Sequence, residues 1–158
     1  MGGGTTPSQA NSPIFLARVE AARGKVLDQH PDAMLYYVKA TTKNPEGVTS
    51  PSQLMEMEIM FRLDDGVATI TSTGQGHEEF GPIDVRPGPI LGNANLDWPI
   101  SLDVSEADTL LKQQGHTGSY DAVTLRKPLY PGMKGNYYFF SMVDGPDFSV
   151  GTESREVS

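Results

Sequence analysis

Residues 54–73 carry the clearest structural signal in this chain, because apolar and polar side chains alternate there. Every odd-numbered position from 55 to 63 is apolar, whereas Glu56, Glu58 and Arg62 occupy even-numbered ones. This alternation predicts a strand with one buried face. Asp65-Gly66 favours a tight turn, and β-branched residues alternate again over 67–73. We therefore expect a β-hairpin that packs on the helix before it, since two strands alone are not stable in water.

The composition limits the classes of function. With 158 residues, of which 37% are hydrophobic, the chain can bury a core in one domain or in two small halves. The formal net charge of -8, with only 12 Lys and Arg, argues against a nucleic-acid partner, because phosphate binding needs a basic surface. Cysteine is absent, which excludes disulfides, thiol catalysis and metal–thiolate sites. No apolar run reaches the length of a membrane span, so membrane contact is expected only through an N-terminal lipid anchor.

Residues 1–12 contain no side chain that needs burial, and they are expected to form a flexible tether. Met1-Gly2 with Thr6 fits the short N-myristoylation pattern, and a cloning remnant is a second interpretation. A third is that Met1 replaces the lipid-bearing cysteine of a bacterial lipoprotein, because Gly-, Ser- and Thr-rich tethers follow such cysteines. We favour this third interpretation.

Two groups of elements flank a Gly- and Pro-rich stretch. Ser12-Pro13 predicts the start of a helix over 13–29, and a strand over 33–42, a loop over 43–52 and the hairpin follow. A capping-box pattern at Ser105 to Asp108 predicts a second helix over 105–114, and strands are expected over 120–127, 136–143 and 148–157.

The expected fold class is therefore α+β, with two tandem α-β-β-β units, each a helix packed on an antiparallel sheet. The expected division of the chain is a tether over 1–12, a first unit over 13–73, a linker over 74–99 and a second unit over 100–158.

This pattern resembles a known family. The order of elements, Asp32-Ala33-x-Leu35-Tyr36 before the first strand, Leu102-Asp103-x-Ser105-x-Ala107 before the second helix and a closing strand near Val157 are similar to PepSY-like proteins. These in turn resemble the tandem repeats of the beta-lactamase inhibitor proteins. The resemblance implies a secreted or envelope-anchored module that binds or inhibits another protein, sometimes a peptidase, through the exposed sheet face and loops. The lack of cysteine departs from disulfide-bearing inhibitors.

No stretch carries a clear catalytic or metal signature. His77-Glu78-Glu79 lacks the histidine spacing of a zinc helix and is better interpreted as a solvated acidic loop, so no metal or cofactor is expected. Met34, Met55, Met57 and Met60 do not share one strand face, which favours core packing over a copper site. Catalytic triads and phosphate loops find no matching motif. We therefore expect a protein that is not an enzyme.

Aromatic side chains are the best candidates for binding. Tyr36-Tyr37 and Tyr137 to Phe140 lie on predicted strands, where adjacent residues face opposite ways, so one member of each Tyr pair should be buried and the other exposed. Tyr37 and Tyr138 are the candidates for the exposed positions, although the sequence does not decide between the members of each pair. The remaining candidates are Trp98, His77 and Tyr130 in the loops 74–99 and 128–135.

The function expected from these features is a non-enzymatic, extracytoplasmic module that binds or inhibits another protein, such as a secreted or envelope enzyme. One alternative is a sensor of a small molecule or metal, with a site between the two halves that involves Trp98 and His77. Another is an enzyme whose activity depends on His77 or Asp97.

Overall fold

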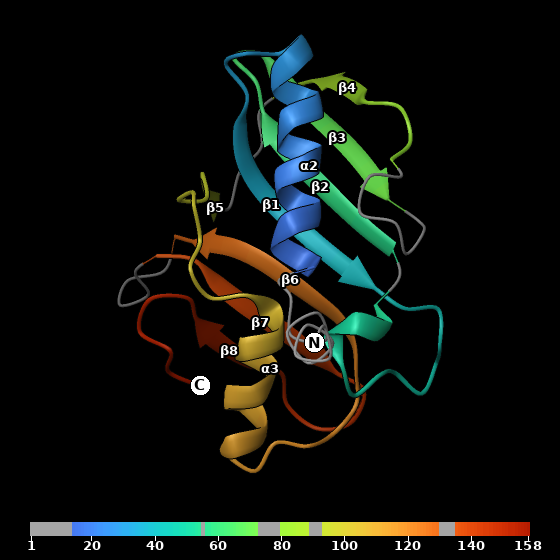
Figure 1. The fold of residues 1–158 in the computed structure, drawn as a ribbon, viewed down its shortest axis with the longest axis vertical. Helices are drawn as coiled ribbons and strands as arrows, with labels where there is room; N and C mark the ends of the chain where they lie inside the picture. Colours follow the sequence, from blue (N-terminus) through green and yellow to red (C-terminus); the bar gives the residue numbers. More distant parts are fainter. Residues whose placement is uncertain (1–13, 55, 73–79, 89–92, 130–134) are drawn as a thin grey trace, which may run out of the picture.

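The computed structural model describes residues 14–54, 56–72, 80–88, 93–129 and 135–158. The N-terminal half contains α2 (Ile14–Gln29), β1 (Met34–Thr41), the short 3-10 helix η2 (Pro51–Gln53), β2 (Glu56–Arg62) and β3 (Gly66–Ser72). Two short strands follow, β4 (Asp84–Pro87) and β5 (Asn93–Ala94). The C-terminal half contains α3 (Val104–Gln113), β6 (Tyr120–Pro128), β7 (Tyr137–Met142) and β8 (Phe148–Gly151), as Figure 1 shows.

The strands form one antiparallel sheet in the order β4-β3-β2-β1-β6-β7-β8, and β5 pairs beside β6 (Figure 1). The hairpin register places Ile59 opposite Ile70 and Phe61 opposite Ala68. The two halves meet where β1 pairs with β6, from Val38 opposite Leu125 to Thr41 opposite Ala122. The strands of both halves are thus continuous in one sheet.

The expected fold class of two tandem helix-on-sheet units is therefore wrong. The described residues form a mostly β fold with a single sheet and two α-helices, and no boundary separates a first sheet from a second. The physical reason is that β2 pairs with only one edge of β1, so a separate sheet of β1, β2 and β3 would leave the backbone groups on the other edge of β1 unpaired, and β6 satisfies them. The stretch expected to be a linker, 74–99, also contributes β4 and β5 to the sheet.

Most individual elements were predicted correctly. α2, β1, the hairpin, α3, β6 and β7 lie within one to three residues of their expected bounds. The hairpin also buries the expected face, since Met57, Ile59 and Phe61 are at most 3% exposed. The last strand is shorter than expected, because β8 ends at Gly151 and the chain turns before Val157 bridges to Val150.

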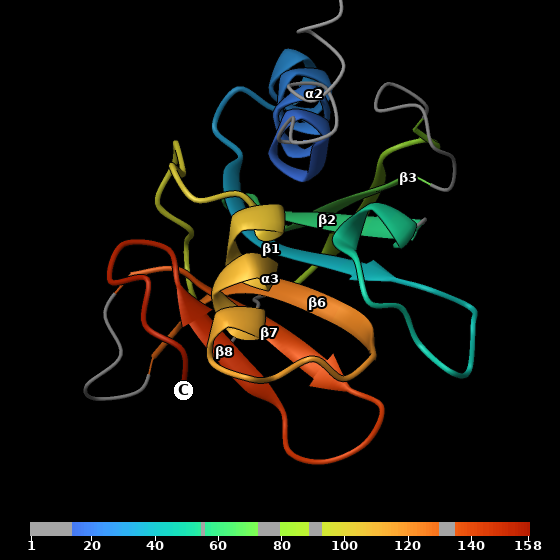
Figure 2. The same cartoon turned by 60° about the horizontal axis from the view of Figure 1, so that its bottom comes forward.

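Both helices cover the same face of the sheet (Figure 2). α2 buries Phe15, Val19, Ala22 and Val26, which recur at helical spacing. α3 buries Val104, Ala107 and Leu111 against the same core. One hydrophobic core therefore lies between the helices and the sheet, and it includes residues from β1, β2, β3, β6, β7 and β8.

Asp103 connects the two helices. One of its carboxylate oxygens accepts from the backbone N–H of Leu16 in the first turn of α2, at 3.1 Å, and the other accepts from Ser105 N–H in α3, at 3.2 Å. Glu106 in turn accepts from the backbone N–H of Asp103, which completes a capping box. The expected box at Ser105 and Asp108 therefore lies two residues too late. A carboxylate beside two helix N-termini interacts favourably with both helix dipoles.

We predict that Asp103→Ala lowers the free energy of unfolding by about 1–3 kcal/mol, because it removes an N-cap and leaves the Leu16 N–H without its acceptor. Urea denaturation monitored by circular dichroism measures the loss. Asp103→Asn keeps one carbonyl acceptor and should lose less, and Asp144→Ala in the exposed β7–β8 turn is the matched control. A midpoint for Asp103→Ala equal to that of the control contradicts the role given to Asp103.

Candidate binding face

The sheet face opposite the helices carries no helix within the described residues, and we call it the open face (Figure 2). Side chains that alternate with the core positions lie on it. On β1 to β3 they are Tyr37, Lys39, Thr41, Glu56, Glu58, Met60, Arg62, Val67, Thr69 and Thr71, and on β6 and β7 they are Thr124, Arg126, Tyr137, Phe139 and Ser141. Most of them are half-buried by their neighbours in the sheet. The alternation that builds the core thus also builds this surface.

The strand registers bring these side chains into rows that cross both halves of the chain. Lys39 lies opposite Glu58 on one side and opposite Thr124 on the other. Thr124 lies opposite Phe139. A second row contains Met60 opposite Tyr37 and Arg126 opposite Tyr137. Directly opposite residues on antiparallel strands have Cβ atoms about 4.5–5.5 Å apart, so each row is a continuous surface.

One end of the open face combines arginine and aromatic side chains, namely Tyr37, Arg62, Arg126, Tyr137 and Phe139, which we call the aromatic–arginine patch. The Arg126 guanidinium carbon lies 4.2 Å from the centre of the Phe139 ring. The Tyr137 and Phe139 ring centres are 6.2 Å apart. Arg62 stacks on Tyr36 at 4.7 Å. Cation–π contacts of this kind hold the guanidinium groups against the aromatic rings.

The other end of the open face is more polar. Glu56 and Glu58 lie there, and Lys43 pairs with Glu56 at 3.5 Å. A hollow of about 220 Å³ is lined by Lys39, Thr41, Glu56, Met57, Glu58, Thr71 and Ser72. The open face therefore has an end with arginine and aromatic side chains and an end where Lys and Glu side chains lie among hydroxyl groups, and the row that joins Phe139 to Glu58 lies between them.

The structure separates the tyrosines that the sequence left undecided. Tyr37 is half-buried on the open face, as expected. Tyr138 is fully buried, so its assignment to an exposed position is wrong, and Tyr137 is the member of that pair on the open face. The Tyr138 hydroxyl donates to the Leu102 carbonyl at 2.8 Å. Burial, followed by the nearby carboxylates of Asp103 and Glu106, raises the pKa of Tyr138 well above its ordinary value.

The other candidates do not gather into one site. Trp98 is half-buried against the core, and its indole N–H donates to Glu20 of α2 at 2.8 Å, which indicates a packing role. Asp97 pairs with Lys127 at 3.1 Å. His77 and Tyr130 lie outside the described residues, as does the whole of His77-Glu78-Glu79. In the part of the chain that the structure describes, no three His, Asp or Glu side chains are grouped so as to hold a metal ion.

The sequence interpretation missed Arg62 and Arg126, and it named Phe139 only as a member of the aromatic cluster from Tyr137 to Phe140. Their positions were predictable in part, since each alternates with buried residues on a strand that was predicted. That these side chains lie on one continuous face was not predictable, because this depends on the pairing of β1 with β6. Tyr36 also departs from simple alternation. A β-bulge lies between Leu35 and Tyr37, so Tyr36 is only 1% exposed although its neighbour Leu35 is buried too.

Comparisons with known proteins show a likeness of fold. The chain is similar to the crystal structure of a candidate lipoprotein from Clostridium difficile 630, with a TM-score of 0.61, 13% sequence identity and coverage of 87% of each chain. No family model matches the sequence. No curated protein matches it either. The PepSY-like resemblance therefore stays a prediction. None of the helices in the described residues has the length and apolar character needed to cross a membrane.

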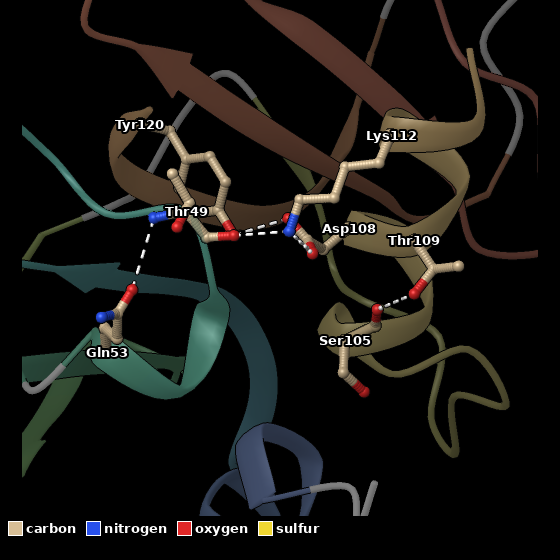
Figure 3. Close-up of polar contacts among 7 residues, drawn as sticks. All are labelled: Thr49, Gln53, Ser105, Asp108, Thr109, Lys112 and Tyr120. Atoms are coloured by element: carbon tan, nitrogen blue, oxygen red, sulfur yellow. Dashed lines mark hydrogen bonds and ion pairs between the residues drawn. The ribbon is translucent and has the colours of Figure 1, made fainter. Parts of the chain in front are cut away.

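A second polar cluster joins α3, β6 and the segment before η2 (Figure 3). The Tyr120 hydroxyl donates to Asp108 at 2.8 Å, and the Lys112 ammonium donates to the other Asp108 oxygen at 2.7 Å. Lys112 also donates to the Thr49 carbonyl. Both Asp108 oxygens therefore accept hydrogen bonds from other residues of the chain, and the cluster holds α3 against β6 and the segment before η2. Burial, together with the charge and hydrogen bond of Asp108, raises the pKa of Tyr120 far above its ordinary value.

We predict that Tyr120→Phe lowers the free energy of unfolding at neutral pH by about 1–3 kcal/mol, because one buried oxygen of Asp108 loses its donor. The difference from wild type should shrink above pH 10. There the unfolded Tyr120 loses its proton while the folded one, with its raised pKa, keeps it, so wild type alone loses that stabilisation as the pH rises. Urea denaturation at neutral pH and at pH about 10 to 11 tests this.

The matched control is Tyr137→Phe, which removes a hydroxyl from the open face. It should change the stability by no more than about 0.5 kcal/mol at neutral pH. If the difference between wild type and Tyr120→Phe is constant across the whole pH range, the buried Tyr120–Asp108 contact is not the cause of the stabilisation.

Proposed function

We propose that this chain is a non-enzymatic protein-binding module of the bacterial cell envelope, and that the open face is its binding surface. Two observations support the envelope assignment. The chain is similar in fold to a candidate bacterial lipoprotein, and residues 1–12 have the Gly-, Ser- and Thr-rich composition of a lipoprotein tether. In this proposal the tether carries the module at the membrane, and no membrane-spanning helix is needed.

The aromatic–arginine patch is the observation that carries the binding function. Tyr and Arg are enriched among the side chains that dominate the energy of protein interfaces. Here Tyr37, Tyr137 and Phe139 are only half-buried, and Arg126 is held against a ring. They stand on β-strands of a large sheet, so they lose little conformational freedom when a partner arrives. A rigid surface of this kind can bind a protein without first reorganising.

The division of the open face indicates the chemistry of the partner. Arg62 and Arg126 bring positive charge to the aromatic rings, and this combination favours acidic groups that lie beside apolar ones. At the other end Glu56 pairs with Lys43, and Lys39 lies opposite Glu58, so that end offers an acidic group no excess of positive charge. The partner is therefore a protein segment whose acidic side chains lie over β6 and the end of β2. If that segment borders an enzyme active site, binding would also inhibit the enzyme.

The test begins with capture from the envelope fraction of the source cell on the immobilised full chain, followed by affinity measurements on the captured protein. We predict that Arg126→Ala and Phe139→Ala each weaken its affinity roughly tenfold or more, as expected for interface hot spots. Thr71→Ala, an exposed position at the other end of the open face, should change it by less than about twofold.

The folded state of each variant is checked by its urea midpoint, so that a loss of binding is not a loss of structure. The affinity should also fall as salt is raised, because the contact with Arg126 is electrostatic. The proposal fails if no protein is retained, or if a retained protein binds Arg126→Ala and Phe139→Ala as tightly as wild type.

A further inference from the structure

The two edges of the sheet differ in how they are covered. At the β8 edge, the Ser149 N–H donates to the Ser158 carbonyl at 3.0 Å, and the Ser158 N–H donates to the Ser149 carbonyl at 2.9 Å. At the opposite edge, every residue of β4 is exposed. Val85 is 50% exposed and is among the few large apolar side chains in the described residues that reach solvent to this extent. β4 therefore presents an edge to which another strand can be added.

The pairing with β3 shows which backbone groups of β4 point outward. Pro87 lies opposite Gly66 and has no N–H to donate, whereas the next residue, Gly88, donates to the Asp65 carbonyl at 3.2 Å. Bonded and non-bonded pairs alternate along an antiparallel ladder. Arg86 and Asp84 are therefore at the bonded positions with β3, and the N–H and C=O of Val85 point away from the sheet.

The side chains of β4 are self-complementary. Asp84 and Arg86 lie on the same face of the strand, and the Arg86 Nε–H donates to Asp84 at 2.8 Å. If a second copy of β4 pairs antiparallel about Val85, Asp84 of one copy lies opposite Arg86 of the other, and the reverse pair forms at the same time. The two Asp84 and two Arg86 side chains then lie at the corners of a square, and each charge has charges of the opposite sign beside it along the strand and across it. The two Val85 side chains meet on the other face of the strand, where each is now exposed.

We propose that β4 pairs with β4 of a second copy of this chain, centred on Val85, so that two sheets join into one across a two-fold axis. The outward N–H and C=O of each Val85 exchange two hydrogen bonds, and opposite charges meet on both sides of them. Pro87 lacks the outward donor that would extend the ladder, so the added pairing is short. Because the β8 edge is occupied by residues 156–158, the assembly closes as a dimer.

A short edge strand with charged residues and a proline is also how proteins prevent unwanted strand pairing. That explanation requires charges at the edge but does not require their order to be self-complementary. If the strands pair as proposed, reversing one charge of Asp84-Val85-Arg86 weakens the dimer, whereas reversing both charges restores it. An edge that is only protected by its charges shows no such difference.

The experiment measures self-association of the full chain by sedimentation equilibrium up to millimolar concentration. Wild type should dimerise. Asp84→Arg and Arg86→Asp should each dimerise roughly tenfold more weakly, because two attractive cross-strand pairs become repulsive. An equal mixture of these two variants should form a heterodimer, because every facing pair is then opposite in charge. The doubly reversed variant, Asp84→Arg with Arg86→Asp, should recover the wild-type affinity.

Asp144→Arg is the matched control, since it makes the same change of charge at an exposed turn away from β4 and should dimerise like wild type. All these side chains are exposed, so at concentrations low enough for the chain to be monomeric the variants should unfold at the wild-type urea midpoint. The proposal is overturned if wild type is monomeric at millimolar concentration. It is also overturned if both single reversals dimerise as wild type does, or if the mixture associates no better than either variant alone. None of these outcomes depends on whether the open face binds a partner.

Discussion

The pairing of β1 with β6 is the contact on which the rest of the molecule depends. It comprises four residue pairs, from Val38 with Leu125 to Thr41 with Ala122, and it makes one sheet out of strands that are far apart in the sequence. Because the sheet is continuous, α2 and α3 share one core on one face. The open face is continuous for the same reason. The aromatic–arginine patch spans this junction, with Tyr37 on β1 and Arg126 on β6.

The helices are held by polar contacts that few residues supply. Asp103, only 4% exposed, accepts hydrogen bonds at the N-terminal ends of both helices. The hydroxyl of Tyr138 donates to the carbonyl of Leu102, the residue before Asp103. The Tyr138 ring packs edge-on against the Phe15 ring, with 5.7 Å between the ring centres. A buried carboxylate of this kind stabilises a fold when all its oxygens are satisfied, and it is costly when one partner is removed. The Asp108 cluster applies the same principle in the middle of α3.

Periodicity in the sequence was sufficient to predict the local elements. The alternation of Met57, Ile59 and Phe61 predicted the buried face of the hairpin, and the spacing of Phe15, Val19 and Val26 predicted the buried stripe of α2. Periodicity says nothing about which strand lies beside which. The expectation of two units was wrong because the repeated order of helix and strands is equally compatible with two sheets or with one. Strand pairing is set by long-range contacts that no local pattern records.

The candidate site was predictable to a smaller extent. Alternation required Tyr137 and Tyr138 to face opposite sides, but their order depends on the register of β7 with β6. At Tyr36 the rule itself fails, because a single bulge adds one residue to the strand. The capping residue was misplaced by two positions, since both Asp103 and Ser105 are favourable N-caps and only the tertiary contact with Leu16 favours Asp103.

The first helix fixes the side of the sheet on which the described chain begins. α2 begins at Ile14 on the helix-covered side, next to Asp103 and directly after the stretch interpreted as a tether. The described chain therefore begins on the helix-covered side of the sheet, and the open face lies on the other side. A partner on the open face and the start of α2 are thus separated by the thickness of the sheet and its core.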